Sequence, residues 1–311
     1  MNICLVGYGA IAQNHMEALS RLGAVNPRFL VGPRSEPRRA FAEQWKFQHH
    51  DAELDDALDD AEVDAVVITS PSALHAPQAR AALQAGKHVL LEIPAALDAQ
   101  EVQQLAQLAR RVDRRLMICH TMRYMAAMQH VRGMVRTGQF RLHQIVGFFG
   151  TSRRNNTTAA GNPRSWTDNI LWHHGAHLVD LAMWMTDCRE AGRIACRFGP
   201  PHPTQGIMDM TLTMTLTGGV LATVTQSYNL SRFRWRVLFI GEEDTLEFDA
   251  GELTDAAGKV IVPRQSIVDL HEQDREFIAA VNEGRDPTTT AEDVLPAMYT
   301  LQAAQADAER T

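Results

Sequence analysis

Residues 2–12 read NICLVGYGAIA, and this stretch decides the fold. Asn2–Val6 is a short apolar run typical of a buried strand, and Ile11–Leu22 carries apolar residues at helical spacing. The turn between them, residues 7–12, fits Gly-x-Gly-x-x-Ala. Its first glycine permits a tight turn, and its second lets a pyrophosphate approach the backbone amides at the helix start. A plain strand-turn-helix is the alternative, but this context favours a dinucleotide site formed by Gly7, Gly9, Ala10 and Ile11.

The alternation of strand and helix continues well beyond this first unit. The expected strands are Arg28–Val31, Val63–Thr69, His88–Leu91 and Leu116–Cys119, and the expected helices between them include Pro77–Ala85 and Ala99–Val112. Strands that alternate with helices in this way predict an α/β fold, a Rossmann-type doubly wound parallel sheet. We therefore predict a cofactor domain over residues 1–122.

The pattern changes in the second part of the chain. Residues 210–217 alternate apolar side chains with threonine, Gly218-Gly219 marks a hairpin turn, and Val220–Ser227 is the return strand. Further strands are expected at Arg234–Ile240 and Thr245–Phe248, and helices at Arg275–Val281 and Ala291–Ala308. Residues 123–311 are thus predicted to form an α+β domain with a large, mostly antiparallel open sheet, whose last helix can pack back on the first domain.

Composition narrows the class of protein. A chain of 311 residues fits two domains, and its formal net charge of -7 disfavours a nucleic-acid partner. The four cysteines have no zinc-ribbon or Cys-x-x-Cys spacing, which indicates buried free thiols in a reducing compartment. No apolar run approaches the roughly 18 residues needed to cross a bilayer. We expect a cytoplasmic protein without a membrane or nucleic-acid partner.

The end of the second strand bears on the choice of cofactor. NAD enzymes usually place an acidic residue there to bind the ribose 2′-hydroxyl, whereas this chain has Arg34, followed by Arg38 and Arg39. Arg34 can stack on adenine and pair with a 2′-phosphate. Glu36 is an acidic residue in this segment and so argues for NAD, but we expect it to cap the next helix. The sequence therefore favours NADP, with NAD as the alternative.

Two further segments carry a family resemblance. Residues 70–75 (SPSALH) and 85–94 (AGKHVLLEIP) resemble the glucose–fructose oxidoreductase and inositol dehydrogenase (Gfo/Idh/MocA) family, and the resemblance extends over essentially the whole chain. It implies that Ser70, Pro71, His75, Glu92 and Pro94 lie near the cofactor. His75 and Glu92 can equally be ordinary residues of a helix start and a strand end. The chain departs from the family at two positions, with Ile93 in place of the usual lysine and His173 in place of the usual aspartate.

These two departures point to a particular group within the family. Residues 153–156 (RRNN) and 163–174 (PRSWTDNILWHH) look like members of this family that act on ring compounds with two carboxylates, either in the protocatechuate 4,5-cleavage route or on a phthalate cis-dihydrodiol. In the first case the resemblance implies oxidation of a cyclic hemiacetal to a lactone. Arginine suits carboxylates because it donates two parallel hydrogen bonds. The predicted substrate-binding residues are Arg123, Arg153, Arg164, Ser165, Trp166 and His174.

A cluster of histidines is the predicted source of the base. His173 and His177 are four residues apart on an expected helix and share a face, whereas His174 is expected to point about 100° away. An imidazole has a pKa near working pH and can accept a hydroxyl proton. The family resemblance places the catalytic histidine at His177. A structural histidine cluster satisfied by Asp180 is the second possibility, and a zinc site, which lacks an evident third ligand, is the third.

Two other classes of function stay open. Some proteins of this fold are non-catalytic cofactor-binding regulators, and the loss of the family lysine at Ile93 is compatible with that. The histidine pair would also suit a metallohydrolase, although we expect no metal. By family analogy, the Thr- and Met-lined sheet suggests a homodimer or homotetramer. The expected ligand is a small, aromatic-derived dicarboxylate.

Overall fold

The computed structural model describes residues 1–23, 25–33, 35–155 and 169–310. The chain forms two compact units. The described residues of Met1–Cys119 and Val268–Leu295 make the first unit, and those of His120–Thr157, Gly161–Ile267 and Pro296–Thr311 make the second. The first unit is therefore not one continuous segment, because residues near the end of the chain return to it. None of the helices in the described ranges has the length and apolar character that a bilayer span requires.

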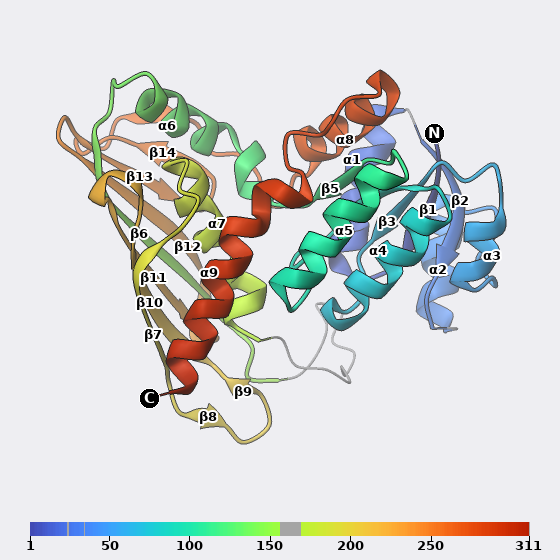
Figure 1. Ribbon diagram of the computed structural model, residues 1–311, viewed down its shortest axis with the longest axis horizontal. Coiled ribbons are helices and arrows are strands. Elements are labelled where there is room, and N and C mark those ends of the chain that lie inside the picture. The colour runs from blue at the N-terminus through green and yellow to red at the C-terminus, as the bar shows by residue number, and fades with distance from the viewer. Residues whose placement is uncertain (24, 34, 156–168, 311) are drawn as a thin grey trace. The chain divides into compact units, whose positions relative to one another are not determined.

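A five-stranded sheet in the order β2-β1-β3-β4-β5 forms the centre of the first unit (Figure 1). All of its neighbouring strands are parallel. The strands are β1 (Asn2–Val6), β2 (Asn26–Val31), β3 (Ala65–Ile68), β4 (His88–Leu91) and β5 (Leu116–Ile118). The helices are α1 (Ala10–Leu22), α2 (Glu36–Trp45), α3 (Leu54–Asp59), α4 (His75–Gln84), α5 (Ala99–Arg111) and α8 (His271–Glu283). The predicted Rossmann fold is confirmed.

Burial explains why these strands form a parallel sheet. Every residue of β3 and β5 is buried, as a strand covered on both faces requires. The turn after β1 depends on Gly7, whose φ is +103° and where a Cβ would lie 2.8 Å from the Thr69 carbonyl oxygen. The glycine is therefore needed both for its backbone conformation and for the close approach of the chain after β3.

The second unit is built on an eight-stranded sheet in the order β15-β14-β13-β12-β6-β11-β10-β7. Among the described residues, only the central β6–β11 pair of this sheet is parallel, so the predicted mostly antiparallel sheet is confirmed. The large strands are β6 (Leu142–Ser152), β7 (Gly192–Phe198), β10 (Asp209–Thr215), β11 (Leu221–Ser227), β12 (Asn229–Gly241) and β13 (Thr245–Asp249). The short strands are β8 (Pro201–His202), β9 (Gly206–Ile207), β14 (Glu252–Thr254) and β15 (Val260–Val262), and the helices are α6 (Ala126–Arg136), α7 (Ala176–Met185) and α9 (Ala291–Glu309), which begins in the first unit.

The two faces of this sheet differ. On β10, Met210 and Met214 are buried and Thr211 and Thr213 are exposed, so methionine and threonine do not line one face together as the sequence suggested. Helix α7 packs on the buried face, since Leu178 lies where a Cβ on Gly147 of β6 would be only 3.1 Å away.

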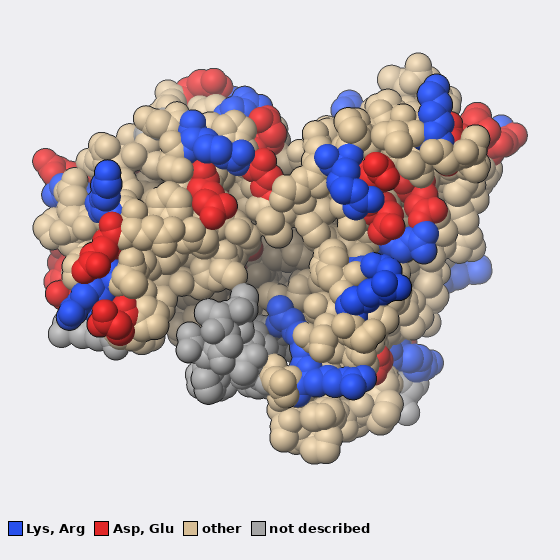
Figure 2. All heavy atoms as spheres, turned by 180° about the vertical axis from the view of Figure 1, so that it is seen from behind, with Lys and Arg blue, Asp and Glu red and all other residues tan. Residues whose placement is uncertain are grey.

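On the surface drawn in Figure 2, acidic and basic side chains lie intermixed.

Candidate active site

The glycine-rich turn of the first unit fits a pyrophosphate. Gly9 is the N-cap of α1 and has no capping side chain, and the first turn of α1 carries no acidic residue. A Cβ at Gly9 would meet nothing within 4 Å, so the space beside the backbone is open. The amides of Ala10 and Ile11 start the helix there. An exposed helix N-terminus with uncapped N–H groups favours an anion.

The neighbouring basic segment is only partly described, because Arg34 lies outside the described residues. Arg38 is buried and donates to the Gly32 carbonyl oxygen at 2.9 Å and to Asp51 at 3.0 Å. Its guanidinium is therefore occupied by the fold. Ser35, rather than Glu36, is the N-cap of α2 and accepts a hydrogen bond from the Arg38 backbone amide, which corrects the cap expected from the sequence.

His75 links two of the segments that the family resemblance assigned to the cofactor. Its ring nitrogens lie 2.7 Å from the carbonyl oxygens of Ser70 and Pro94, and its side chain is buried. The Ser70 hydroxyl donates to Gln78 at 2.6 Å. His75 thus joins the turn after β3, with Ser70 and Pro71, to the turn after β4, with its Ile93–Pro94 peptide. This geometry gives His75 a positioning role at that edge of the sheet.

Glu92 belongs to a buried charged cluster. The His15 ring lies between two carboxylates, with Nε2 3.0 Å from Glu92 and Nδ1 2.9 Å from Asp274 of α8. Burial opposes the charged imidazole, but Asp274 and then Glu92 outweigh it and raise the pKa of His15 to about 10. The Cys119 thiol lies near the same site, and ligand atoms of His15, Glu92 and Cys119 are within 4.8 Å of one another. A protonated His15 ring would supply the positive charge that these two carboxylates favour.

The histidines of the second unit lie on a widened helical turn. Leu171–Gly175 form a π-helix that continues into α7, and the Gly175 amide donates to the Ile170 carbonyl oxygen at 3.0 Å, a bond spanning five residues. π-turns of this kind are frequent at functional sites. Their larger number of residues per turn changes the directions that an α-helix predicts for His173, His174 and His177.

His174 is part of the cluster, contrary to the direction expected for it. Its ring stacks on Phe149 of β6 with centroids 4.0 Å apart, and its centroid is 4.2 Å from that of His173 and 6.4 Å from that of His177. Its Nδ1 lies 2.7 Å from the Tyr228 hydroxyl. His174 therefore contacts both the sheet and the neighbouring histidine.

Arg153 reaches the same cluster through an aromatic ring. Its guanidinium lies 5.2 Å from the centroid of Tyr228, and burial lowers the pKa of Arg153. Arg153 and His174, both predicted to bind substrate, therefore contact the same tyrosine. Arg164, Ser165 and Trp166 lie outside the described residues.

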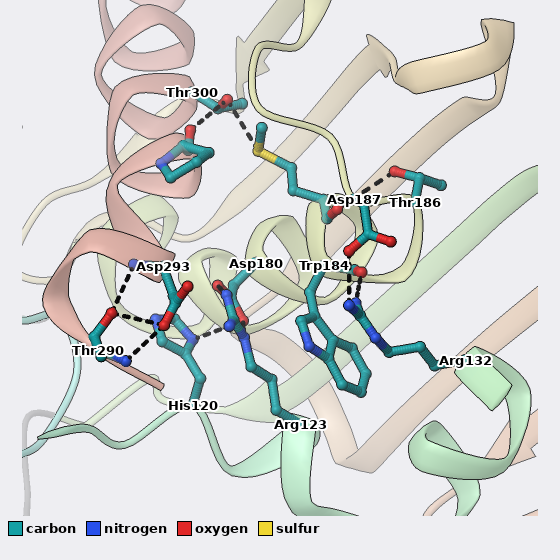
Figure 3. A network of polar contacts seen from close by, with 12 residues as sticks. His120, Arg123, Arg132, Asp180, Trp184, Thr186, Asp187, Thr290, Asp293 and Thr300 are labelled. Atoms are coloured by element: carbon teal, nitrogen blue, oxygen red, sulfur yellow. Dashed lines mark hydrogen bonds and ion pairs between the residues drawn. The ribbon is translucent and has the colours of Figure 1, made fainter. Parts of the chain in front are cut away.

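Arg123 holds Asp180, as Figure 3 shows. It follows β5 and lies on a short helical turn, Thr121–Tyr124. It donates to Asp180 twice, from Nε at 2.8 Å and from Nη2 at 2.6 Å. His120 Nδ1 is 3.3 Å from the same carboxylate, and the His120 and His177 ring centroids are 6.5 Å apart. The histidine cluster therefore has a fixed negative charge behind it.

Several residues of this arrangement were not predicted. Phe149, Tyr228 and Trp235 supply its aromatic walls, with the Trp235 ring centroid 5.7 Å from that of His177. Gln226 lies in the same region. A signal for Gln226 existed, because it occupies an inward position of β11 after Ala222 and Val224, where the alternation demands an apolar residue.

Comparison with known proteins agrees with both halves of the fold. Residues 1–120 match the family described as "Oxidoreductase family, NAD-binding Rossmann fold", and residues 126–262 match "Bacterial oxidoreductases, C-terminal". The chain belongs to this Gfo/Idh/MocA oxidoreductase family, as the sequence resemblance predicted. It is an oxidoreductase with an NAD-binding Rossmann fold.

A curated relative is similar over nearly its full length. It is the 4-carboxy-2-hydroxymuconate-6-semialdehyde dehydrogenase of a Sphingobium species, 33% identical over 95% of either chain. An uncharacterised oxidoreductase of Escherichia coli is 27% identical over 59% of this chain and 53% of its own length. Among solved structures, GenD2 from gentamicin A biosynthesis, in complex with NAD, has a TM-score of 0.84 at 22% identity and covers 99% of this chain and 94% of its own. Levoglucosan dehydrogenase with NADH and L-sorbose reaches 0.86 at 16% identity, covering 100% and 97%. These two structures share the fold.

Proposed function

We propose that this protein is an NADP-dependent dehydrogenase that oxidises the cyclic hemiacetal of 4-carboxy-2-hydroxymuconate-6-semialdehyde to 2-pyrone-4,6-dicarboxylate, a step of protocatechuate 4,5-cleavage. The observation that carries the proposal is the 33% identity to the Sphingobium enzyme over 95% of each chain. The π-turn with His173, His174 and His177 supports it, because the reaction needs a neutral imidazole beside the reacting hydroxyl.

The chemistry divides between the cofactor and the chain. The turn with Gly7, Gly9, Ala10 and Ile11 would hold NADP, which would supply the acceptor for the hydride of the hemiacetal carbon. An imidazole of the cluster, assigned to His177, takes the hydroxyl proton as the carbon–oxygen double bond of the lactone forms. The charge that develops on this ring lies near Asp180, whose carboxylate Arg123 fixes with two hydrogen bonds. A fixed carboxylate stabilises the imidazolium electrostatically.

The structure suggests a different role for Arg123 from the one predicted. Arg123 was predicted to bind a substrate carboxylate, but its bidentate contact with Asp180 favours a supporting role. We assign carboxylate recognition to Arg153 and, outside the described residues, to Arg164. The choice of NADP depends on Arg34, also outside the described residues, and on the absence of an acidic residue directly after β2.

A steady-state assay tests the proposal. The purified protein is supplied with NADP or NAD and with either the semialdehyde or a phthalate cis-dihydrodiol, and formation of reduced cofactor is followed. We expect the highest kcat/KM with the semialdehyde and NADP. Faster oxidation of the dihydrodiol would assign the alternative substrate, and no reduction of either cofactor with either compound would favour a non-catalytic regulator.

A further inference from the structure

Three residues form a row across the central strands of the second sheet. Gln226 of β11 is paired in register with Phe149 of β6, and Phe149 is paired with Trp235 of β12. Residues paired in this way across neighbouring strands project from the same face, with strands about 4.8 Å apart. Gln226 and Trp235 therefore flank Phe149, with roughly 10 Å between their backbones.

This row lies directly under the histidine-bearing turn. His174 stacks on the central Phe149, and the Trp235 ring contacts that of His177. On the other side, a Cβ on Gly175 would lie 3.7 Å from Gln226 Oε1, so the amide reaches the backbone between His174 and Ala176. The three side chains thus form a floor beneath the proposed base.

The outer members of the row carry polar atoms that the protein itself does not satisfy. Gln226 is 1% exposed, and neither Oε1 nor Nε2 has a hydrogen-bond partner among the described residues. Trp235 is 7% exposed, and its indole nitrogen likewise has no partner in the described part of the chain. Buried polar groups are nearly always hydrogen-bonded, so two residues with unsatisfied polar atoms in one row need an explanation.

We propose that Gln226 and Trp235 are substrate-binding residues that hydrogen-bond two separate oxygen substituents of the ring substrate. The indole N–H can only donate, so its partner is an acceptor such as a carboxylate oxygen. The Gln226 amide both donates and accepts, which suits a hydroxyl or a carboxylate. This inference rests on the proposed function for the identity of the ring.

The test compares Gln226→Met and Trp235→Phe with wild type, with Met210→Leu as the control. Met210 of β10 is paired with Gln226 and so lies next to the row of three. It is buried and apolar. Each test variant removes hydrogen-bonding atoms while nearly conserving volume. We expect KM for the semialdehyde to rise about tenfold in each, with KM for NADP within twofold of wild type.

Thermal unfolding of the free protein supplies the second readout. Gln226→Met removes an unsatisfied buried amide, so its Tm should equal or exceed that of wild type while substrate binding weakens. An unchanged KM would show that the amide is merely tolerated in the core and would overturn the inference. A lowered Tm would also overturn it, because the amide would then have a partner in the free protein.

The same variants separate this inference from the proposed function. All are assayed on the semialdehyde, a phthalate cis-dihydrodiol and myo-inositol. If wild type oxidises only the dihydrodiol or only myo-inositol, the proposed function fails. KM for that compound is then compared between each variant and wild type, and a rise of about tenfold still supports a substrate-binding role for Gln226 and Trp235. A wild type that oxidises none of the three overturns both.

Discussion

Arg123 and Asp180 form a buried ion pair joined by two hydrogen bonds, of 2.8 Å and 2.6 Å. Both residues are at most 5% exposed. Burial alone raises the pKa of Asp180, but Arg123 first and then His120 lower it below its ordinary value. The carboxylate is therefore charged in the folded protein, and it depends on its guanidinium partner.

Replacing Arg123 with methionine should destabilise the second unit by about 3–5 kcal/mol, because it leaves an uncompensated buried carboxylate. The double variant Arg123→Met, Asp180→Leu should recover most of this loss, since no buried charge remains. Urea unfolding followed by circular dichroism measures both. The sequence predicted instead that Arg123 binds a substrate carboxylate directly. In that case the Arg123→Met variant should have the same stability as wild type, and only KM for the dicarboxylate should rise.

The fold could be predicted largely because burial leaves a local pattern. His88–Leu91 was predicted with its observed bounds, since a fully buried parallel strand is an uninterrupted apolar run ended by turn residues. The alternation in 210–217 predicted β10 and, with the glycine turn after it, the hairpin partner β11. The strand expected at Leu116–Cys119 is β5, after which the chain enters the Thr121–Tyr124 turn and then α6.

The site was less predictable because its geometry is not local. Hydrophobic periodicity cannot distinguish an α-turn from the π-turn at Leu171–Gly175, so it did not predict the contacts that the His174 ring makes. The partner of Arg123 lies 57 residues further along the chain, and no spacing rule connects them. Gln226 is different, since a polar residue at an inward strand position was visible in the sequence.

The cofactor preference is tested at Arg34. Arg34→Glu places a negative charge where a 2′-phosphate is expected, so KM for NADP should rise sharply and KM for NAD much less. The matched control is Arg39→Glu, because Arg39 is an exposed arginine of α2 whose guanidinium lies 3.9 Å from the Glu36 carboxylate. Steady-state kinetics with both cofactors measures the effect. Equal use of NAD and NADP by wild type would contradict the assignment.

The base is tested at His177. His177→Asn should lower kcat by about 10²–10⁴-fold, the usual contribution of a positioned base, with NADP affinity nearly unchanged. His173→Asn should have the same effect or a somewhat smaller one. His174 cannot serve as the control, because its ring lies in the cluster. The control is His143→Asn, an exposed histidine of β6 that pairs with Glu242 at 3.5 Å.

A His173→Asn, His177→Asn double variant that retained full activity would show that the histidines only support the structure. Stoichiometric zinc in the purified protein, with activity lost on chelation, would instead favour the metal alternative.

The stability of the first unit should fall as pH rises, because of His15. The pKa of His15 is about 10 in the folded protein, raised by Asp274 and Glu92 above an ordinary value of 6.5. A raised folded-state pKa means that the folded protein holds a proton that the unfolded chain releases. The stabilisation is therefore complete below pH 6.5 and is lost progressively as pH rises toward 10. The unfolding midpoint, measured by scanning calorimetry across this range, should decrease accordingly. His15→Gln should be destabilised at pH 6 and nearly lose this pH dependence, whereas His130→Gln, a change of an exposed histidine of α6, should keep it. If His15→Gln retained the wild-type slope, another group would be responsible, and the charged state assigned to His15 would be wrong.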